Sequence, residues 1–125
     1  MPPEWEIEEY VDDGDGRPIR DFMRHLTPAE QGRLRTRLRY LRMNGLRAGG
    51  HVIKNLTGKA GDPRRKLWEL RLENSPHNPR ILFFPTVGRR FVLLHGFKKI
   101  GRSNDRIPER DIAIALDRMR DHLER

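Results

Sequence analysis

The sequence predicts a small α+β domain, a mostly antiparallel β-sheet with an N-terminal α-hairpin packed on it and a C-terminal helix. The expected element order is β-α-α-β-β-β-α. Apolar and polar residues alternate over 68–72, and two longer apolar runs follow at 81–84 and 91–97. A Ser-Pro-His-Asn-Pro cluster and a Val-Gly pair separate the three segments, as turns do in an antiparallel meander. This meander supplies the sheet that the flanking helices need to cover.

The N-terminal third predicts one strand and two helices. Apolar and polar residues alternate from Trp5 to Val11, but the pattern fails at Glu9-Tyr10, which predicts a bulge or an early end. After an acidic, glycine-containing turn, Pro18 begins a short helical pattern, and residues 27–30 form a complete capping box for a second helix. Arginines cover much of the outer surface of that second helix: Arg33, Arg35, Arg37, Arg39 and Arg42. They are either a solvated face or a ridge that contacts phosphates.

The segments around the meander are predicted from helix breakers and from charge. Residues 46–63 contain four glycines and end in Pro63, which predicts a loop that carries a mobile basic segment beside the sheet. Pro108 is expected to start the last helix, with Glu109 and Asp111 in its first turn, where the helix dipole favours acids.

Length and composition restrict the class of protein. The 125 residues fit one domain, residues 1–125, with a modest core. The absence of cysteine excludes disulfides and thiolate metal sites. The five histidines show no ligand spacing, so we expect no metal and no cofactor. No apolar run approaches a membrane span and no signal peptide is evident, so a cytoplasmic location without a membrane partner is expected.

The charge is unevenly distributed along the chain. The net charge is +8, yet residues 1–15 contain seven acids and no Lys or Arg, so the remaining chain carries +15. A field of this size favours a polyanionic partner through steering and counterion release. The alternative is an arginine-rich genome composition, because 21 of the 26 basic residues are Arg.

Four short segments in the same order resemble the HigB-type, phage-derived branch of the RelE/ParE toxin superfamily. The matching positions are Glu69-Leu70-Arg71, Arg80-Ile81-Leu82-Phe83-Phe84, Leu94-His95-Gly96-Phe97-Lys98-Lys99, and Pro108, Asp111, Ile112, Ala115 and Arg118. The resemblance implies a RelE-like sheet with an α-hairpin, and a type II toxin that cuts mRNA in the ribosomal A site. It also implies a helix-turn-helix, HigA-like antitoxin as partner, together with mRNA and the 70S ribosome. Operator DNA could be bound through the toxin–antitoxin complex.

Cleavage of RNA by side chains alone requires a base for the 2′-OH, a cation for the phosphate and an acid for the leaving group. We expect Arg71 and Arg80 to clamp the phosphate, or alternatively to pair with Glu69 or another acid of the sheet. Lys98 and Lys99 are candidates for phosphate contact or for the acid. His95 is either an acid–base group or a hydrogen-bonded structural histidine.

Further basic and aromatic residues are candidates for RNA binding. They are Lys54, Lys59, Arg64, Arg65, Lys66, Arg89, Arg90, Phe97 and Arg102. Phe97 could stack on a base, but it could equally belong to the core.

The sequence leaves two other functions open. A noncatalytic nucleic-acid-binding module, such as a degenerate toxin that represses its operon with an antitoxin, is favoured by two departures from the family pattern: the segment before Pro108 is longer than usual, and a frequent Tyr is missing. A third departure is Pro79, which replaces a common aromatic. Inhibition of gyrase, as in ParE, is the second alternative, although the segment 95–99 favours the RNA-cleaving branch.

Overall fold

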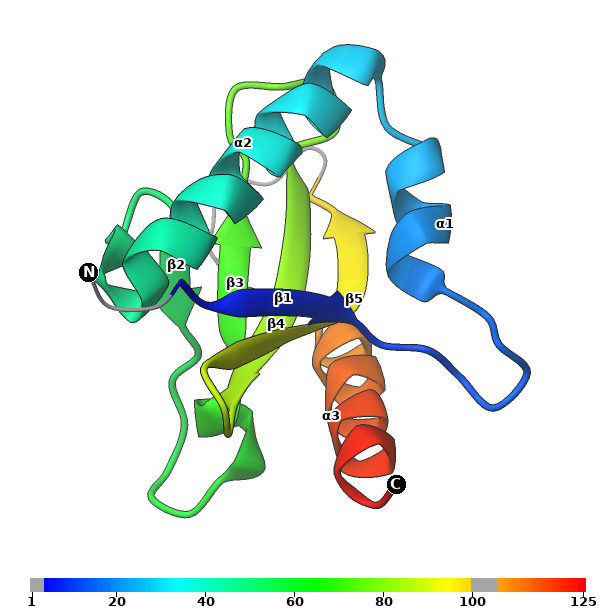
Figure 1. The fold of residues 1–125 in the computed structure, drawn as a ribbon, viewed down its shortest axis with the longest axis vertical. Helices are drawn as coiled ribbons and strands as arrows, with labels where there is room; N and C mark the ends of the chain where they lie inside the picture. Colours follow the sequence, from blue (N-terminus) through cyan, green and yellow to red (C-terminus); the bar gives the residue numbers. More distant parts are fainter. Residues whose placement is uncertain (1–3, 100–105) are drawn as a thin grey trace.

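The chain forms one five-stranded sheet with helices on both faces (Figure 1). The structure is a computed structural model and describes residues 4–99 and 106–125. The elements are β1 (Glu6–Glu9), α1 (Pro18–Arg24), α2 (Pro28–Asn44), the short 3₁₀ helix η1 (Gly45–Ala48), β2 (Ile53–Asn55), the 3₁₀ helix η2 (Pro63–Lys66), β3 (Trp68–Arg71), β4 (Pro79–Thr86), β5 (Arg90–Lys98) and α3 (Glu109–Leu123). The predicted α+β class is confirmed. No helix within the described ranges could cross a lipid bilayer.

One strand was absent from the prediction. The segment 46–63, expected to be a loop, contains η1 and the edge strand β2, which pairs antiparallel with β3. β2 has only three residues, with Ile53 buried and Lys54 exposed. Three residues are too few for a period-2 pattern to be recognised among glycines, so the loop assignment was wrong here.

The strand order is β1-β5-β4-β3-β2, with β1 parallel to β5 and all other neighbours antiparallel. Helices α1 and α2 cover one face over a core that includes Leu34, Leu70 and Phe83. Helix α3 covers the other face, over a core that includes Leu82 and Ile112. Both faces of β4 are therefore buried, which explains its continuous apolar run.

A bulge in β5 decides which side chains face α3. Leu82 pairs with His95 but the next residue, Phe83, pairs with Leu93, so Leu94 is the extra residue. The bulge shifts the alternation by one position. His95 therefore turns toward α3, whereas Gly96 turns toward α1, where an added Cβ would collide with the ring of Phe22.

Helix α2 is fixed at its start by a buried carboxylate. The predicted capping box is confirmed: the Thr27 hydroxyl accepts the Glu30 N–H, and the Glu30 carboxylate accepts the Thr27 N–H. The same carboxylate also binds the backbone N–H of His77 at 3.0 Å and its Nδ1 at 2.7 Å. Burial alone would raise the pKa of Glu30, but the hydrogen bonds from His77 and Thr27 outweigh it and lower the pKa to about 2. Glu30 therefore ties α2 to the β3–β4 connection.

Replacing Glu30 by Gln is expected to flatten the acid side of the stability curve. Because the folded-state pKa lies below the ordinary value, ionised Glu30 stabilises the fold above about pH 4.5, and this stability is lost as the pH falls toward 2. Urea unfolding of wild type and Glu30→Gln at a series of pH values measures this, with the exposed Glu124→Gln as control. The two free energies of unfolding should converge as the solution becomes acidic. Parallel curves would contradict this role of Glu30.

Candidate functional site

A buried carboxylate lies at the centre of a charged cluster on the α3 face of the sheet. Arg71 and Arg80 are directly opposite each other on β3 and β4, and Glu69 is opposite Leu82. Lys54 on β2 is opposite Glu69 from the other side. Since side chains alternate along a strand, Glu69, Arg71 and Arg80 share the face of Leu82, which belongs to the α3 core.

Two acids hold the two arginines. Arg71 Nε lies 3.4 Å from Glu69 Oε1, and its Nη2 lies 3.1 Å from Glu73 Oε1. Arg80 approaches the same two carboxylates at 3.7 and 3.9 Å. Its Nη1 also donates to the carbonyls of Leu72 (2.9 Å), Asn78 (3.1 Å) and Pro79 (3.3 Å). The alternative in which both arginines pair with acids of the sheet is therefore the arrangement observed, and Arg80 also ties together the β3–β4 connection.

One oxygen of Glu69 receives no hydrogen bond from the residues that the structure describes. The residue is 2% exposed, and its Oε2 is buried and accepts no hydrogen bond from the described residues. Burial raises the pKa of Glu69, while the positive charges of Arg80, Arg71, Lys99 and Lys54 act against this shift. A buried carboxylate with spare acceptor capacity is uncommon in a folded protein and is typical of a functional position.

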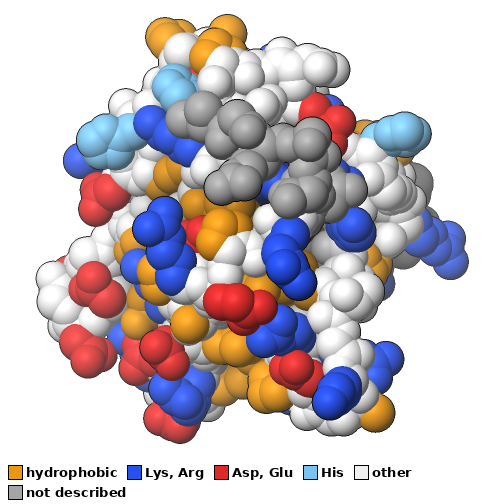
Figure 2. All heavy atoms as spheres, turned by 180° about the vertical axis from the view of Figure 1, so that it is seen from behind, with side chains coloured by type: hydrophobic (Ala, Val, Ile, Leu, Met, Phe, Trp, Pro, Cys, Tyr) orange, Lys and Arg blue, Asp and Glu red, His pale blue; other side chains and the backbone are white. Residues whose placement is uncertain are grey.

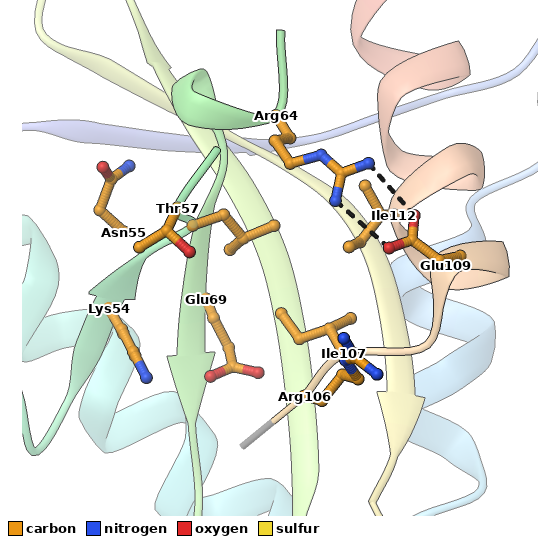
Figure 3. Close-up of a pocket in the computed structure, with 10 residues that line it drawn as sticks. Lys54, Asn55, Thr57, Arg64, Glu69, Arg106, Ile107, Glu109 and Ile112 are labelled. Carbon is orange, nitrogen blue, oxygen red and sulfur yellow. Dashed lines mark hydrogen bonds and ion pairs between the residues drawn. The ribbon is translucent and has the colours of Figure 1, made fainter. Parts of the chain in front are cut away.

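Glu69 lines a hollow of about 330 Å³ between β2, η2 and the start of α3 (Figure 3). Lys54, Glu69 and Arg106 extend toward the same end of this hollow. At the other end, Arg64 makes a two-point ion pair with Glu109, at 3.3 and 3.2 Å. In the view from behind, basic, acidic and apolar side chains are mixed on this side of the molecule (Figure 2). The hollow therefore combines the Glu69 carboxylate with the exposed cations Lys54 and Arg106 at one end and an Arg64–Glu109 ion pair at the other.

The two predicted lysines lie in different surroundings. Lys99 is 7% exposed, and its backbone N–H donates to the carbonyls of His77 and Asn78. Its charge lowers the pKa of Glu69, which places it beside the cluster. Lys98 is exposed and pairs with Pro79 at the end of β5. Only Lys99 is thus brought to the candidate site.

His95 lies under α3. Its Nε2 is 2.7 Å from Asp111 Oδ1, and its Nδ1 is 3.3 Å from Arg118 Nη1, which also donates to the Leu94 carbonyl. Phe97 stacks beside it and is 8% exposed within the α3 core. Both residues therefore fasten α3 to β5, and the Phe97 ring is not open for base stacking.

The other predicted RNA-binding residues are dispersed. Arg89 lies 5.0 Å above the Trp5 ring and Arg90 donates to the Val87 carbonyl, at the hairpin end of the sheet opposite the Arg71–Arg80 pair. Arg65 and Lys66 border a separate groove beside Phe84, and Lys59 is exposed in a loop. Arg102 lies outside the described residues. Of this set, the structure places Lys54 and Arg64 at the hollow.

Three residues of the charged cluster and the hollow were not among the predicted site residues. They are Glu69, which lies at the centre of the cluster, Glu73 and Arg106. Glu69 had been considered only as an ion-pair partner. The available signal was an acid inside a strand, between Trp68 and Leu70, opposite a continuous apolar run. No group of three or more potential metal ligands occurs in the part of the chain that the structure describes.

Replacing His95 by Gln is expected to reduce the dependence of stability on pH near neutrality. Burial lowers the pKa of His95, Asp111 opposes this shift, and Arg118 and Arg110 reinforce it. Because the folded-state pKa lies below 6.5, the neutral form of His95 stabilises the folded state. This contribution to the free energy of unfolding is complete above about pH 6.5 and is lost as the pH falls through the folded-state pKa. Unfolding free energies between about pH 7 and 5 test this, with the exposed His25→Gln as control. An unchanged slope in the His95 variant would contradict it.

Comparison with known proteins identifies the family of the chain. Residues 21–120 match the model of a family described as phage derived protein Gp49-like (DUF891). No curated protein matches the chain. The matched region runs from α1 to the last turns of α3 and includes the charged cluster and the hollow. Because it covers most of the 125 residues, the chain belongs to the Gp49-like phage-derived family, a toxin-like family of the RelE/ParE superfamily.

Proposed function

We propose that this protein is the toxin of a type II toxin–antitoxin system and cuts mRNA on the ribosome as an endoribonuclease. The observation that carries the proposal is the buried Glu69 carboxylate, which lines the hollow together with Lys54 and Arg106 and lies among the positive charges of Arg80, Arg71 and Lys99. Membership of a toxin-like family supports a toxin–antitoxin role and an antitoxin partner. The helix-turn-helix type of that antitoxin, the ribosome and the binding of operator DNA are parts of the proposal.

In the proposed reaction, Glu69 accepts the proton of a ribose 2′-OH. The 2′-oxygen then forms a bond to the adjacent phosphorus, and the bond from phosphorus to the 5′-oxygen breaks. The Lys99 ammonium gives its proton to that leaving oxygen. The products are a 2′,3′-cyclic phosphate and a 5′-hydroxyl end. Burial makes Glu69 a stronger base than an exposed carboxylate, which suits it to this step.

The cations divide into two groups. Lys54 and Arg106 are exposed at the hollow and would contact the phosphate, where charge grows during the reaction. Arg71 and Arg80 hold Glu69 and Glu73, so their first effect is to keep Glu69 ionised and oriented. Arg80, bound to three carbonyls, is a positioning residue.

Glu69→Gln is the variant that tests the catalytic assignment. Loss of a general base lowers the rate about 10² to 10⁴-fold, and Gln keeps the size of the side chain. Wild type and Glu69→Gln are expressed inducibly in a bacterium, growth is followed, and mRNA 5′ ends are mapped. Wild type should arrest growth and produce new ends within translated frames, whereas Glu69→Gln should do neither.

Two controls accompany this experiment. Glu124→Gln, on an exposed residue at the end of α3, makes the same chemical change and should remain toxic. Thermal unfolding should show that Glu69→Gln is folded. Cleavage by Glu69→Gln at the wild-type rate would rule out Glu69 as the base.

A noncatalytic nucleic-acid-binding module is the second candidate, and one observation favours it. Arg71 and Arg80, the residues expected to clamp the phosphate, are already paired with Glu69 and Glu73. Normal growth and intact mRNA with soluble, folded wild-type protein would support this function in place of cleavage.

A further inference from the structure

The connection between β3 and β4 is held in place by the start of α2 (Figure 1). The Glu30 carboxylate accepts the backbone N–H of His77 through one oxygen, at 3.0 Å, and contacts His77 Nδ1 through the other, at 2.7 Å. Because an ionised carboxylate can only accept, Nδ1 carries the hydrogen. One turn further along α2, Arg33 donates to the carbonyls of Glu73 and Asn74. The helix therefore fixes the connection near both of its ends.

Two residues of this connection adopt a backbone conformation that residues other than glycine rarely take. The φ angles of Asn74 and Asn78 are +57° and +42°. Asparagine tolerates such angles better than most residues, but they persist only where the surrounding contacts determine the backbone. One such pair of contacts joins Ser75 and Asn78, each of which donates its backbone N–H to the side chain of the other, at 3.3 and 3.2 Å. A segment defined to this degree is suited to position the groups that bind to it.

One group that binds to this segment is the backbone of Lys99. Its N–H donates to the carbonyls of His77 and Asn78, at 3.1 and 3.2 Å. Strand β5 ends one residue earlier at Lys98, which is opposite Pro79. Since proline has no N–H, the strand ladder offers no backbone donor at this position. The place of the Lys99 backbone is therefore set by residues 77 and 78.

The Lys99 side chain depends on the position of its backbone. Lys99 is 7% exposed, so packing leaves its side chain little freedom to compensate for a displaced backbone. A displacement of about 1 Å in a reacting group can slow a reaction about 10²-fold. The His77 side chain, 27% exposed, is directed to Glu30. His77 thus acts on Lys99 through the backbone.

We propose that His77 is a positioning residue, whose two hydrogen bonds to Glu30 hold the carbonyl that accepts the Lys99 N–H and so keep the Lys99 ammonium beside the leaving 5′-oxygen. This role rests on the proposed function, in which Lys99 gives its proton to that oxygen. Loss of the His77 ring should therefore impair one step, the departure of the 5′-oxygen. If His77 only stabilised the fold, its loss would lower stability without affecting one step selectively.

The test compares two mRNA substrates at a cleavage site mapped with wild type. One has the ordinary 5′-oxygen at the cleaved bond, and in the other a sulfur atom replaces that oxygen. A thiol has a pKa of about 8.5, far below that of an alcohol, so the sulfur leaves as a thiolate and needs no acid. Each mRNA is placed on ribosomes with saturating full-length protein, and the rate of a single turnover is measured.

His77→Ala should cleave the ordinary mRNA about tenfold or more slowly and the sulfur substrate at the wild-type rate. Lys99→Gln should show the same selective loss. His77→Asn should restore cleavage of the ordinary mRNA, because its amide nitrogen lies as many bonds from the backbone as Nδ1 does. The matched control, His25→Ala at an exposed position, should cleave both substrates as wild type does.

Equal slowing of His77→Ala on both substrates, or no slowing on either, would overturn the positioning role. Slowing of Lys99→Gln on both substrates would also overturn it, because Lys99 would then not be the acid. If thermal unfolding shows that His77→Ala is not folded, His77→Gln, whose donor lies one bond further from the backbone, replaces it with the same expected pattern. Wild type that cleaves neither substrate would overturn the proposed function, whereas active wild type without the selective losses would overturn the positioning role alone.

Discussion

The ion cluster around Glu69 is the constraint on which the rest of the site depends. A carboxylate buried in the sheet is costly unless cations compensate for it, and Arg71 and Arg80 on neighbouring strands supply that compensation. The compensation at Oε2 is by charge alone among the described residues, because Arg80 Nε lies 3.7 Å away and no described residue donates a hydrogen bond to this oxygen. The fold therefore maintains a buried carboxylate that two arginines orient and whose pKa burial raises. Removing one arginine would leave the remaining charges uncompensated, so cluster and fold are coupled.

The helices on the two faces of the sheet are held by different contacts. Helices α1 and α2 form the larger apolar core with β3, β4 and β5 and are tied to the β3–β4 connection by Glu30. On the other face, α3 is fastened to β5 by the Asp111–His95–Arg118 contacts. Because α3 covers only part of this face, the hollow at Glu69 remains next to its N-terminus. His95 does not line the hollow, but its contacts hold α3, whose N-terminus borders the hollow.

Much of the fold could be predicted from local patterns, because turns, capping residues and period-2 alternation are local. The capping box at Thr27 and the three-stranded meander are examples. The features that were missed depend on partners distant in sequence. No periodicity reveals the bulge at Leu94, which decides that His95 faces α3, and β2 becomes a strand only through its pairing with β3. At the site, Arg71 and Arg80 were recognised as a pair, but the roles of Glu69 and Arg106 required the tertiary arrangement.

The central claim is that a side-chain base and acid cleave the RNA, and the chemistry of the product ends tests it most directly. Purified wild-type protein is mixed with ribosomes programmed with a defined mRNA, and the fragment ends are identified by mass spectrometry. Attack by the 2′-oxygen predicts a 2′,3′-cyclic phosphate on the upstream fragment and a 5′-hydroxyl on the downstream one, both absent with Glu69→Gln. A 3′-hydroxyl with a 5′-phosphate would contradict the account, because water rather than the 2′-oxygen would then be the nucleophile.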